Sequence, residues 1–340
     1  MSKGIFFSIL IRMDKVYFLK DFNKLNEASL RLLEGVFLPD SDLLVKIHFG
    51  EGGNKTALFP KDVEPIISAL KFLRLKPTLI DTPVKYNSPR NTVEGYGEII
   101  KERGYDKLAP YLVSNNSVEV QTKDMTVGVC KELTKSKGVL VISHIKGHRC
   151  SGFGGAIKNL GMGGVAKESK IEEHTLGQPV FLSSCKGCGV CVNLCPFGAI
   201  KIEGGSVKFD YSKCGGCSIC ILECPNGCLK PRQAIFDDLL AQGASACINN
   251  LPPNTYYINL IKNITLLCDC VSDSGSIIAP DVGVLFSENP VAIDKASVDL
   301  INEANKQNVF LEENHKDPYL HVKYASEYIN KSWDYELILL

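Results

Sequence analysis

The stretch "CKGCGVCVNLCP", residues 185–196, decides how this chain is expected to fold, because it places four cysteines at short and regular spacing. A second stretch, "CGGCSICILECP" at residues 214–225, repeats the pattern. Both read C-x2-C-x2-C-x3-C-P, and "CPFGAIKI" in the first is answered by "CPNGCLKP" in the second. The two runs therefore form an internal repeat, and each half is expected to supply one short strand and one helical turn.

This spacing is typical of bacterial ferredoxins with two 4Fe-4S clusters, in which three close thiolates bind one cluster and the cysteine before proline binds the other. The predicted ligands are Cys185, Cys188, Cys191 and Cys224 for the first cluster, and Cys214, Cys217, Cys220 and Cys195 for the second. A pair of zinc knuckles is the alternative, but zinc sites usually pair two C-x2-C units across a longer spacer. The spacing therefore favours two 4Fe-4S clusters in a small α+β ferredoxin-like domain over residues 181–231.

Outside this segment, apolar runs alternate with amphipathic stretches. "LLVKIHF" (43–49) and "TYYINLI" (255–261) predict strands, whereas "KDVEPIISALKFLRL" (61–75) and "NPVAIDKASVDLINEANK" (289–306) carry helical spacing. Such alternation on both sides favours one α/β domain with a mostly parallel sheet and helices on both faces. This domain would be discontinuous, over residues 13–180 and 232–340, with the ferredoxin-like segment as an insertion.

Composition limits the class of protein. Lys plus Arg equals Asp plus Glu at 38 each, which gives no reason to expect nucleic acid or a membrane surface as a partner. Fourteen cysteines without an export signal point to metal or redox chemistry in the cytoplasm rather than to a disulfide framework. Met13 opens a strand-like run, so residues 1–12 are expected to be an extension or to precede the true start.

Reactive side chains follow several of the predicted strands. Because ligands bind at the carboxyl ends of strands in open parallel sheets, these residues are expected to meet at one edge. Four of them are predicted to bind an anionic substrate or cofactor: Lys46, His48, Arg90 and Lys158. His144 and His148 are candidates for proton transfer, since histidine titrates near neutrality. The alternative for each is a hydrogen-bonded loop residue.

The glycine-rich stretch 151–164 invites a phosphate-loop interpretation. It lacks the G-K-[ST] ending of a P-loop, and its G-x-G-x-x-A match follows a helix-like segment instead of a strand. A loop leading into a short helix is expected instead. The free N–H groups of that helix could hold an anion together with Lys158, or the glycines could simply allow close packing.

The stretch "LLCDCVSDSG", residues 266–275, holds two cysteines outside the repeat. Residues i and i+2 of an extended segment project to the same side, so Cys268 and Cys270 are expected to face one space, with Asp269 turned away. They are candidates for a third metal or redox site, completed by His148 and Cys150, and for catalysis. The alternative is that Cys268 is a buried core residue.

These stretches together resemble a bacterial and archaeal family of uncharacterised iron-sulfur centre proteins, a domain of unknown function that carries a ferredoxin insert. The similar stretches are "VKIHFGEGGN", "DTPVKYNSPRN", "GHRCSGFGGAIKNLGMG", both cysteine runs, "CDC" and "PDVGVLFSENPVAIDKAS". The resemblance covers most of the chain from about Met13 onward, and it implies iron-sulfur clusters but no particular reaction or catalytic residue.

The leading hypothesis is a cytoplasmic redox protein, a possible ferredoxin-type oxidoreductase. Its two 4Fe-4S clusters would relay single electrons between a redox partner protein and a strand-end site. That site would bind a small anionic substrate or hold a third metal or redox centre. The alternatives are an electron-transfer or docking module without its own substrate site, and a protein that handles a metal or cofactor.

Overall fold

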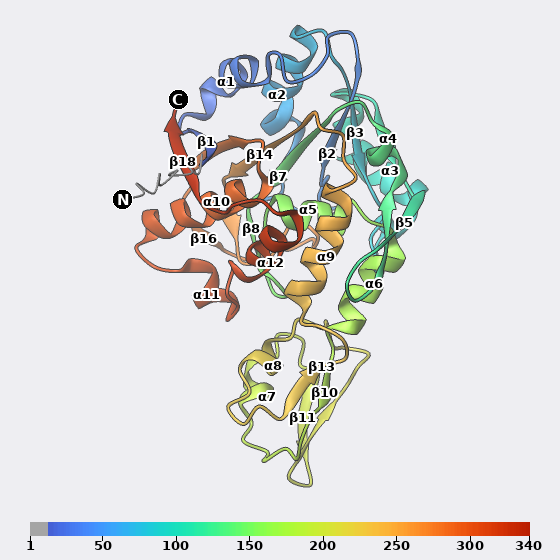
Figure 1. Ribbon diagram of the computed structural model, residues 1–340, viewed down its shortest axis with the longest axis vertical. Helices are drawn as coiled ribbons and strands as arrows, with labels where there is room; N and C mark the ends of the chain where they lie inside the picture. Colours follow the sequence, from blue (N-terminus) through green and yellow to red (C-terminus); the bar gives the residue numbers. More distant parts are fainter. Residues whose placement is uncertain (1–12) are drawn as a thin grey trace, which may run out of the picture.

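The computed structural model describes residues 13–340, so the interpretation of residues 1–12 lies outside the described part of the chain. An eight-stranded sheet forms the centre of the fold (Figure 1). Its order is β18 (Tyr335–Leu339), β1 (Asp14–Leu19), β17 (Gly283–Ser287), β14 (Thr255–Ile261), β7 (Val139–His144), β2 (Asp42–Ile47), β3 (Lys76–Asp81) and β4 (Tyr111–Val113). Within this sheet β17 alone runs against its neighbours. The prediction of a mostly parallel sheet is confirmed.

Helices cover both faces of the sheet because its central strands are apolar on both sides. In β7, Val139 and Val141 face one hydrophobic core, whereas Leu140 and Ile142 face another. The first core is closed by α5 (Ala156–Gly163), α9 (Phe236–Ile248), α10 (Pro290–Asn305) and α12 (Leu320–Ile329). The second core is closed by α1 (Leu25–Leu33), α2 (Pro60–Phe72) and α3 (Val93–Glu102). The mixed α/β class with helices on both faces is therefore as predicted.

The cysteine-rich segment projects from one end of the sheet domain (Figure 1). It follows α6 (Lys167–Leu176) and is closed by β10 (Pro179–Phe181) pairing antiparallel with β13 (Leu229–Pro231). Between these strands lie α7 (Val190–Leu194), the hairpin of β11 (Ile200–Glu203) and β12 (Ser206–Phe209), and α8 (Ile219–Leu222). Each half of the repeat thus contains one short helix followed by a strand.

Smaller elements complete the described chain. They are the pairs β5 (Ser117–Gln121) with β6 (Thr126–Cys130), β8 (Lys146–His148) with β9 (Gly152–Gly154), and β15 (Ile264–Thr265) with β16 (Ile277–Ala279), together with α4 (Lys131–Lys135) and α11 (Val309–Asn314). Across residues 13–340, no helix combines the length and apolar character that a membrane crossing requires.

The sheet has a switch point between β2 and β7. From β2 the chain moves outward to β3 and β4, then returns to place β7 on the other side of β2 and continues to β14. The loops that leave β2 and β7 therefore diverge at their carboxyl ends. A crevice at such a point is the usual ligand site of an open parallel sheet.

Candidate functional site

A cavity of about 390 Å³ lies at the switch point. Its wall includes residues at or just after the carboxyl ends of β2, β3 and β7, among them His48, Asp81 and His144. The loop carrying Cys268 and Cys270 and part of α5 complete the wall. The predicted meeting of reactive residues at one sheet edge is borne out for these loops.

Asp81 is the acidic centre of the cavity floor. Its carboxylate lies 3.0 Å from Nζ of Lys46 and 3.1 Å from Nδ1 of His48, and it accepts a hydrogen bond from the Tyr96 hydroxyl. Burial acts to raise the pKa of Asp81, but Lys46 and His48 hold it well below its usual range. Burial also lowers the pKa of His48. Lys46 and His48 are therefore engaged by Asp81 and offer little charge to a further anion.

Arg90 has a structural partner of its own. Its buried guanidinium lies 2.9 Å from the Glu51 carboxylate and donates to the backbone oxygen of Cys270 at 3.0 Å. It also donates to the Tyr86 hydroxyl. Arg90 is not among the described residues that line the cavity. The prediction that it binds an anion there is replaced by a role in fixing the Cys270 loop.

Three lysines, together with the exposed Arg149, carry the remaining charge of the cavity. Among the described residues, no carboxylate lies within 4.0 Å of the ammonium groups of Lys85, Lys158 or Lys170, which all line the cavity. Lys170 donates to the Thr82 hydroxyl at 2.7 Å and to the Pro83 carbonyl at 2.6 Å. Burial lowers the pKa of Lys158 to about 8 and that of Lys170 to about 7. Of the four predicted anion ligands, only Lys158 keeps a free charge.

The N-terminus of α5 does not supply the free N–H groups that the glycine-rich stretch suggested. The backbone N–H groups of Ala156 and Ile157 donate to the Asp294 carboxylate at 2.7 and 2.8 Å. This buried carboxylate occupies the position that an anion would take. That alternative is wrong because a residue from α10, far along the chain, caps the helix.

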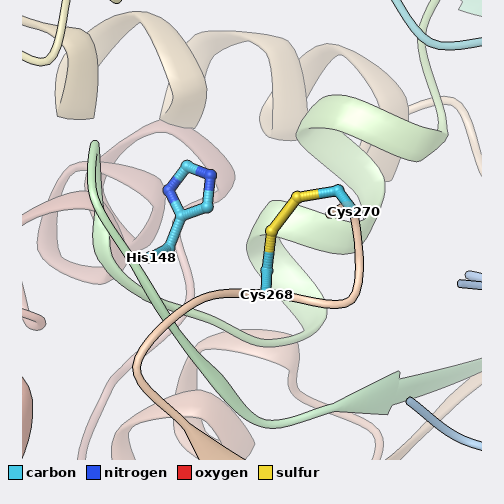
Figure 2. A group of neighbouring side chains, drawn as sticks. All are labelled: His148, Cys268 and Cys270. Atoms are coloured by element: carbon cyan, nitrogen blue, oxygen red, sulfur yellow. A yellow bond between two sulfur atoms is a disulfide. The ribbon is translucent and has the colours of Figure 1, made fainter. Parts of the chain in front are cut away.

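Cys268, Cys270 and His148 form one group beside the cavity (Figure 2). The two cysteines are joined by a disulfide, and one ring nitrogen of His148 and both sulfur atoms lie within 4.8 Å of one another. Asp269 turns away, as predicted, and its carboxylate contacts Nδ1 of His144 at 2.6 Å. The fourth predicted member, Cys150, stands outside the group, with its sulfur 3.8 Å from the Gly215 carbonyl.

His144 has both ring nitrogens engaged. One contacts the Asp269 carboxylate and the other lies 2.7 Å from the Lys262 carbonyl oxygen, with the side chain almost fully buried. Lys146 lies 3.6 Å from the same carboxylate. Burial acts to raise the pKa of Asp269, but His144 and Lys146 keep it well below its usual range. His144 therefore holds the Asp269 loop, and His148 is the histidine that reaches the sulfur pair.

The eight cysteines of the two runs lie in the cysteine-rich segment, and their division between two clusters stays a prediction. Cys185, Cys188, Cys191 and Cys224, the first predicted group, line one small pocket together with Cys228. In the second predicted group, burial raises the pKa of Cys217 to about 11, and the thiols of Cys195 and Cys214 add to the effect. Burial and the neighbouring thiols, Cys217 first, also raise the pKa of Cys220. Each group of four thiols is a donor set that suits a soft metal centre.

The second group lies next to the cavity. Gly215, which follows Cys214, and Phe197, which follows Cys195 by two positions, both line the cavity wall. The Gly215 carbonyl contacts Nδ1 of His174 at 2.5 Å. The first group has no residue among those that line the cavity. The second group therefore lies nearer to the cavity than the first.

Comparison with known proteins places the chain in a family. Residues 43–299 match the family model described as "Domain of unknown function (DUF362)". The chain belongs to the DUF362 family. The matched DUF362 region includes the cavity residues from Lys46 onward, both cysteine runs and the Cys268–Cys270 loop. No curated protein matches the sequence.

Two solved structures are similar to this DUF362 chain in part. A crystal structure of a Thermotoga maritima protein has 9% sequence identity and a TM-score of 0.41, covering 71% of this chain and 50% of that one. The lactate racemase apoprotein from Thermoanaerobacterium thermosaccharolyticum has 10% identity and a TM-score of 0.37, covering 73% and 51%. The chain spans about half the length of each, and neither similarity bears on function.

Sequence reasoning missed several charged residues in or next to the DUF362 site, among them Lys85, Lys170 and Glu173. Lys85 follows β3 by four residues and could have been found by the strand-end rule. Lys170 and Glu173 lie inside α6, where a charged residue gives no signal of burial. Both are buried, and neither carboxyl oxygen of Glu173 has a hydrogen-bond partner among the described residues. Burial raises the pKa of Glu173 well above its usual range.

Proposed function

We propose that this DUF362 protein is an iron-sulfur redox protein in which two 4Fe-4S clusters pass single electrons to or from a ligand of the basic cavity. Cys185, Cys188, Cys191 and Cys224 would hold the first cluster, and Cys195, Cys214, Cys217 and Cys220 the second. The observation that carries the proposal is the contact between the second thiol group and the cavity, made by Gly215 and Phe197. When bound, such clusters supply one-electron transfer at low potential.

The residues around the thiols suit clusters. The backbone N–H of Gly187 donates to the sulfur of Cys185 at 3.3 Å, and that of Ala199 donates to the sulfur of Cys195 at 3.3 Å. Hydrogen bonds of this kind stabilise the negative charge of cluster sulfurs. Gly187 reaches its place with a φ of +64°, which favours glycine. The local backbone is thus arranged to direct N–H groups at ligand sulfurs.

The two thiol groups differ in exposure, which suggests a route. Cys188 of the first group is exposed, whereas Cys217 and Cys220 of the second are buried. An external redox partner protein would exchange electrons at the first group, and the second group would exchange them with the cavity. The ligand there is an anion small enough for the cavity, since Lys85, Lys158 and Lys170 have no carboxylate partner among the described residues.

The test is metal and sulfide analysis of protein purified without oxygen. We expect about eight irons and about eight labile sulfides per chain, four of each for every cluster. Cys217→Ala should lower both to about four and leave the first cluster in place. Protein that holds zinc and no labile sulfide would refute the proposal.

Reoxidation tests the cavity part of the proposal separately. The clusters are reduced with dithionite, the excess is removed, and small carboxylates and phosphate esters are added one class at a time. We expect one class to reoxidise the clusters in the wild type and not in Lys158→Met. Failure of every anionic class with the clusters intact would instead favour a docking module.

A second candidate function is the handling of a metal ion. It is carried by the group of His148, Cys268 and Cys270, whose ligand atoms lie close enough to share one ion once the disulfide is reduced to two thiols. A metal in this position would be present at one equivalent per chain beyond the iron, and Cys270→Ser would remove it.

A further inference from the structure

We infer that Cys268 and Cys270 form a dithiol–disulfide centre that stores two electrons beside the cavity, with the ring N–H of His148 as a hydrogen-bond donor to sulfur. The inference rests on the proposed function, because the two iron-sulfur clusters are its source of electrons. The step is R–S–S–R + 2 e⁻ + 2 H⁺ → 2 R–SH. The bond between the two sulfur atoms breaks, and each sulfur gains one electron and one proton. The protons come from water through the cavity.

The loop that carries the pair is held by hydrogen bonds to its backbone. The carbonyl oxygen of Cys268 accepts from the Ser274 hydroxyl at 3.2 Å, and that of Cys270 accepts from the Tyr86 hydroxyl at 2.7 Å. Between them, the backbone oxygen of Asp269 accepts from the N–H of Glu51 at 2.9 Å. All three carbonyls are thus fixed, two of them by residues far away along the chain, while the sulfur pair lines the cavity. Such positioning suits a reacting group more than a filler of the core.

The side chain of Asp269 adds a second, electrostatic anchor. It is buried and paired with His144 and Lys146, as described above. Asp269, buried against His144 and Lys146, therefore lies on the side of the loop opposite the sulfur atoms. The disulfide can therefore open and close without moving the backbone, because no anchor involves a sulfur atom.

His148 is oriented to donate a hydrogen bond to sulfur. The peptide N–H of Cys150, whose direction the backbone determines, donates to Nδ1 of His148 at 3.3 Å. The Ser151 hydroxyl lies 3.0 Å from the same nitrogen. An Nδ1 that accepts an N–H carries no proton of its own, so the ring proton is on Nε2. The ring nitrogen farther from the backbone is on the side of the sulfur pair (Figure 2).

The position of the ring proton on His148 favours a redox pair over a metal site. A histidine that binds metal through one nitrogen usually donates its other N–H to an acceptor. Here Nδ1 of His148 accepts instead, so the ring presents its N–H to the sulfurs. A thiolate that leaves a disulfide is stabilised by such a donor, whereas a metal ion is not.

The number of electrons also fits. A 4Fe-4S cluster exchanges one electron, and a disulfide needs two. Two reduced clusters in one chain together supply the two electrons that the disulfide needs. The centre would convert one-electron delivery into two-electron chemistry at the cavity, where Lys158 and Lys85 would hold an anionic substrate.

The test counts electrons and thiols in the anaerobic holoprotein. Stoichiometric reduction should consume about four electrons per chain, two at the clusters and two at the disulfide. Cys268→Ser and Cys270→Ser should each lower the count to about two with iron unchanged. Native alkylation before and after reduction, read on the peptide that contains residues 266–275, should find both thiols labelled only after reduction.

His148→Phe tests the hydrogen-bond donor, because phenylalanine keeps a ring and has no N–H. It should slow the appearance of thiols by roughly tenfold or more at unchanged iron content. The exposed His315→Phe is the matched control and should leave the rate unchanged. An equal rate in His148→Phe would refute the role of His148.

Four outcomes would overturn the inference as a whole. They are about two electrons per chain in wild type that holds eight irons, thiols that are free before reduction, sulfurs still joined after the clusters are reduced, and a stoichiometric non-iron metal lost from Cys270→Ser. All four leave the proposed clusters standing, so they differ from failure of the proposed function. Absence of iron and labile sulfide would instead refute both.

Discussion

Replacement of Lys158 by methionine tests whether the cavity binds anions through this ammonium group. Lys158 lines the cavity, and no carboxylate lies within 4.0 Å of its Nζ among the described residues. Burial lowers its pKa to about 8. The ammonium is therefore charged below pH 8 and loses its charge as the pH rises through that value. Anion binding that depends on Lys158 should weaken over the same range.

The size of the effect follows from the fraction of charged lysine. With a pKa of about 8, roughly 91% of Lys158 is protonated at pH 7 and roughly 9% at pH 9. If the anion binds only the charged form, its dissociation constant rises about tenfold between these pH values through Lys158 alone. Lys170 titrates nearby, with a pKa of about 7, and adds its own dependence in both proteins. The ratio of the two dissociation constants, Lys158→Met over wild type, removes that shared part.

Sulfate is a suitable probe because its charge is constant across this range. Its dissociation constant would be measured by titration calorimetry at pH 7 and pH 9, under anaerobic conditions. We expect the ratio to be large at pH 7 and to fall by up to about tenfold at pH 9. Lys101→Met, at an exposed position on α3, is the control and should match wild type. A ratio that is the same at both pH values would refute the assignment of charge to Lys158.

Three further predictions concern the groups around the cavity. Asp269→Asn leaves His144 and Lys146 buried without a carboxylate partner and should lower the free energy of unfolding by about 3–5 kcal/mol. Asp40→Asn in an exposed pair should cost less than about 1 kcal/mol, and equal shifts in calorimetric melting temperature would contradict this. The pKa of Glu173 is raised, so its charged form opposes folding at a pH above the ordinary carboxyl range. Glu173→Gln should therefore melt at the same temperature as wild type or higher at pH 7. A clear drop in melting temperature would mean an ionised, paired carboxylate. A methyl group at Gly147 would clash with the carbonyl oxygen of Leu266, next to the Cys268–Cys270 loop. Gly147→Ala should therefore destabilise the protein and change the reactivity of the cavity thiols. Unchanged alkylation rates of these thiols would argue against this prediction.

Much of the fold could be predicted because the spacing of apolar residues along each segment indicates whether it forms a strand or a helix. The buried run of β7 and the helical spacing of α10 are properties of neighbouring residues, and alternation of such segments constrains the sheet to be mostly parallel. The exception, β17, runs antiparallel between β1 and β14. Nothing in the apolar run of β17 encodes its direction, which depends on how the preceding chain crosses the sheet.

The candidate site was predicted less completely. Lys46 and His48 were correctly expected at a strand end, yet Asp81 of the neighbouring strand already pairs with both. Arg90 was expected among the anion ligands, but Glu51 takes its charge. Strand-end position can be read along one segment. The residue that pairs with a given charge comes from a different segment, so the local sequence pattern does not predict the pair.

The sequence by itself determined the number and spacing of the cysteines and the internal repeat. These depend only on distances along the chain. The tertiary structure alone decided which lysines remain without a carboxylate, that His148 and not Cys150 reaches the sulfur pair, and that the second cysteine group borders the cavity. Each of these is a contact of a few ångströms between residues far apart in sequence. The physical reason is that charge, hydrogen bonding and metal binding act across space, at distances that only the packing of the sheet and its helices sets.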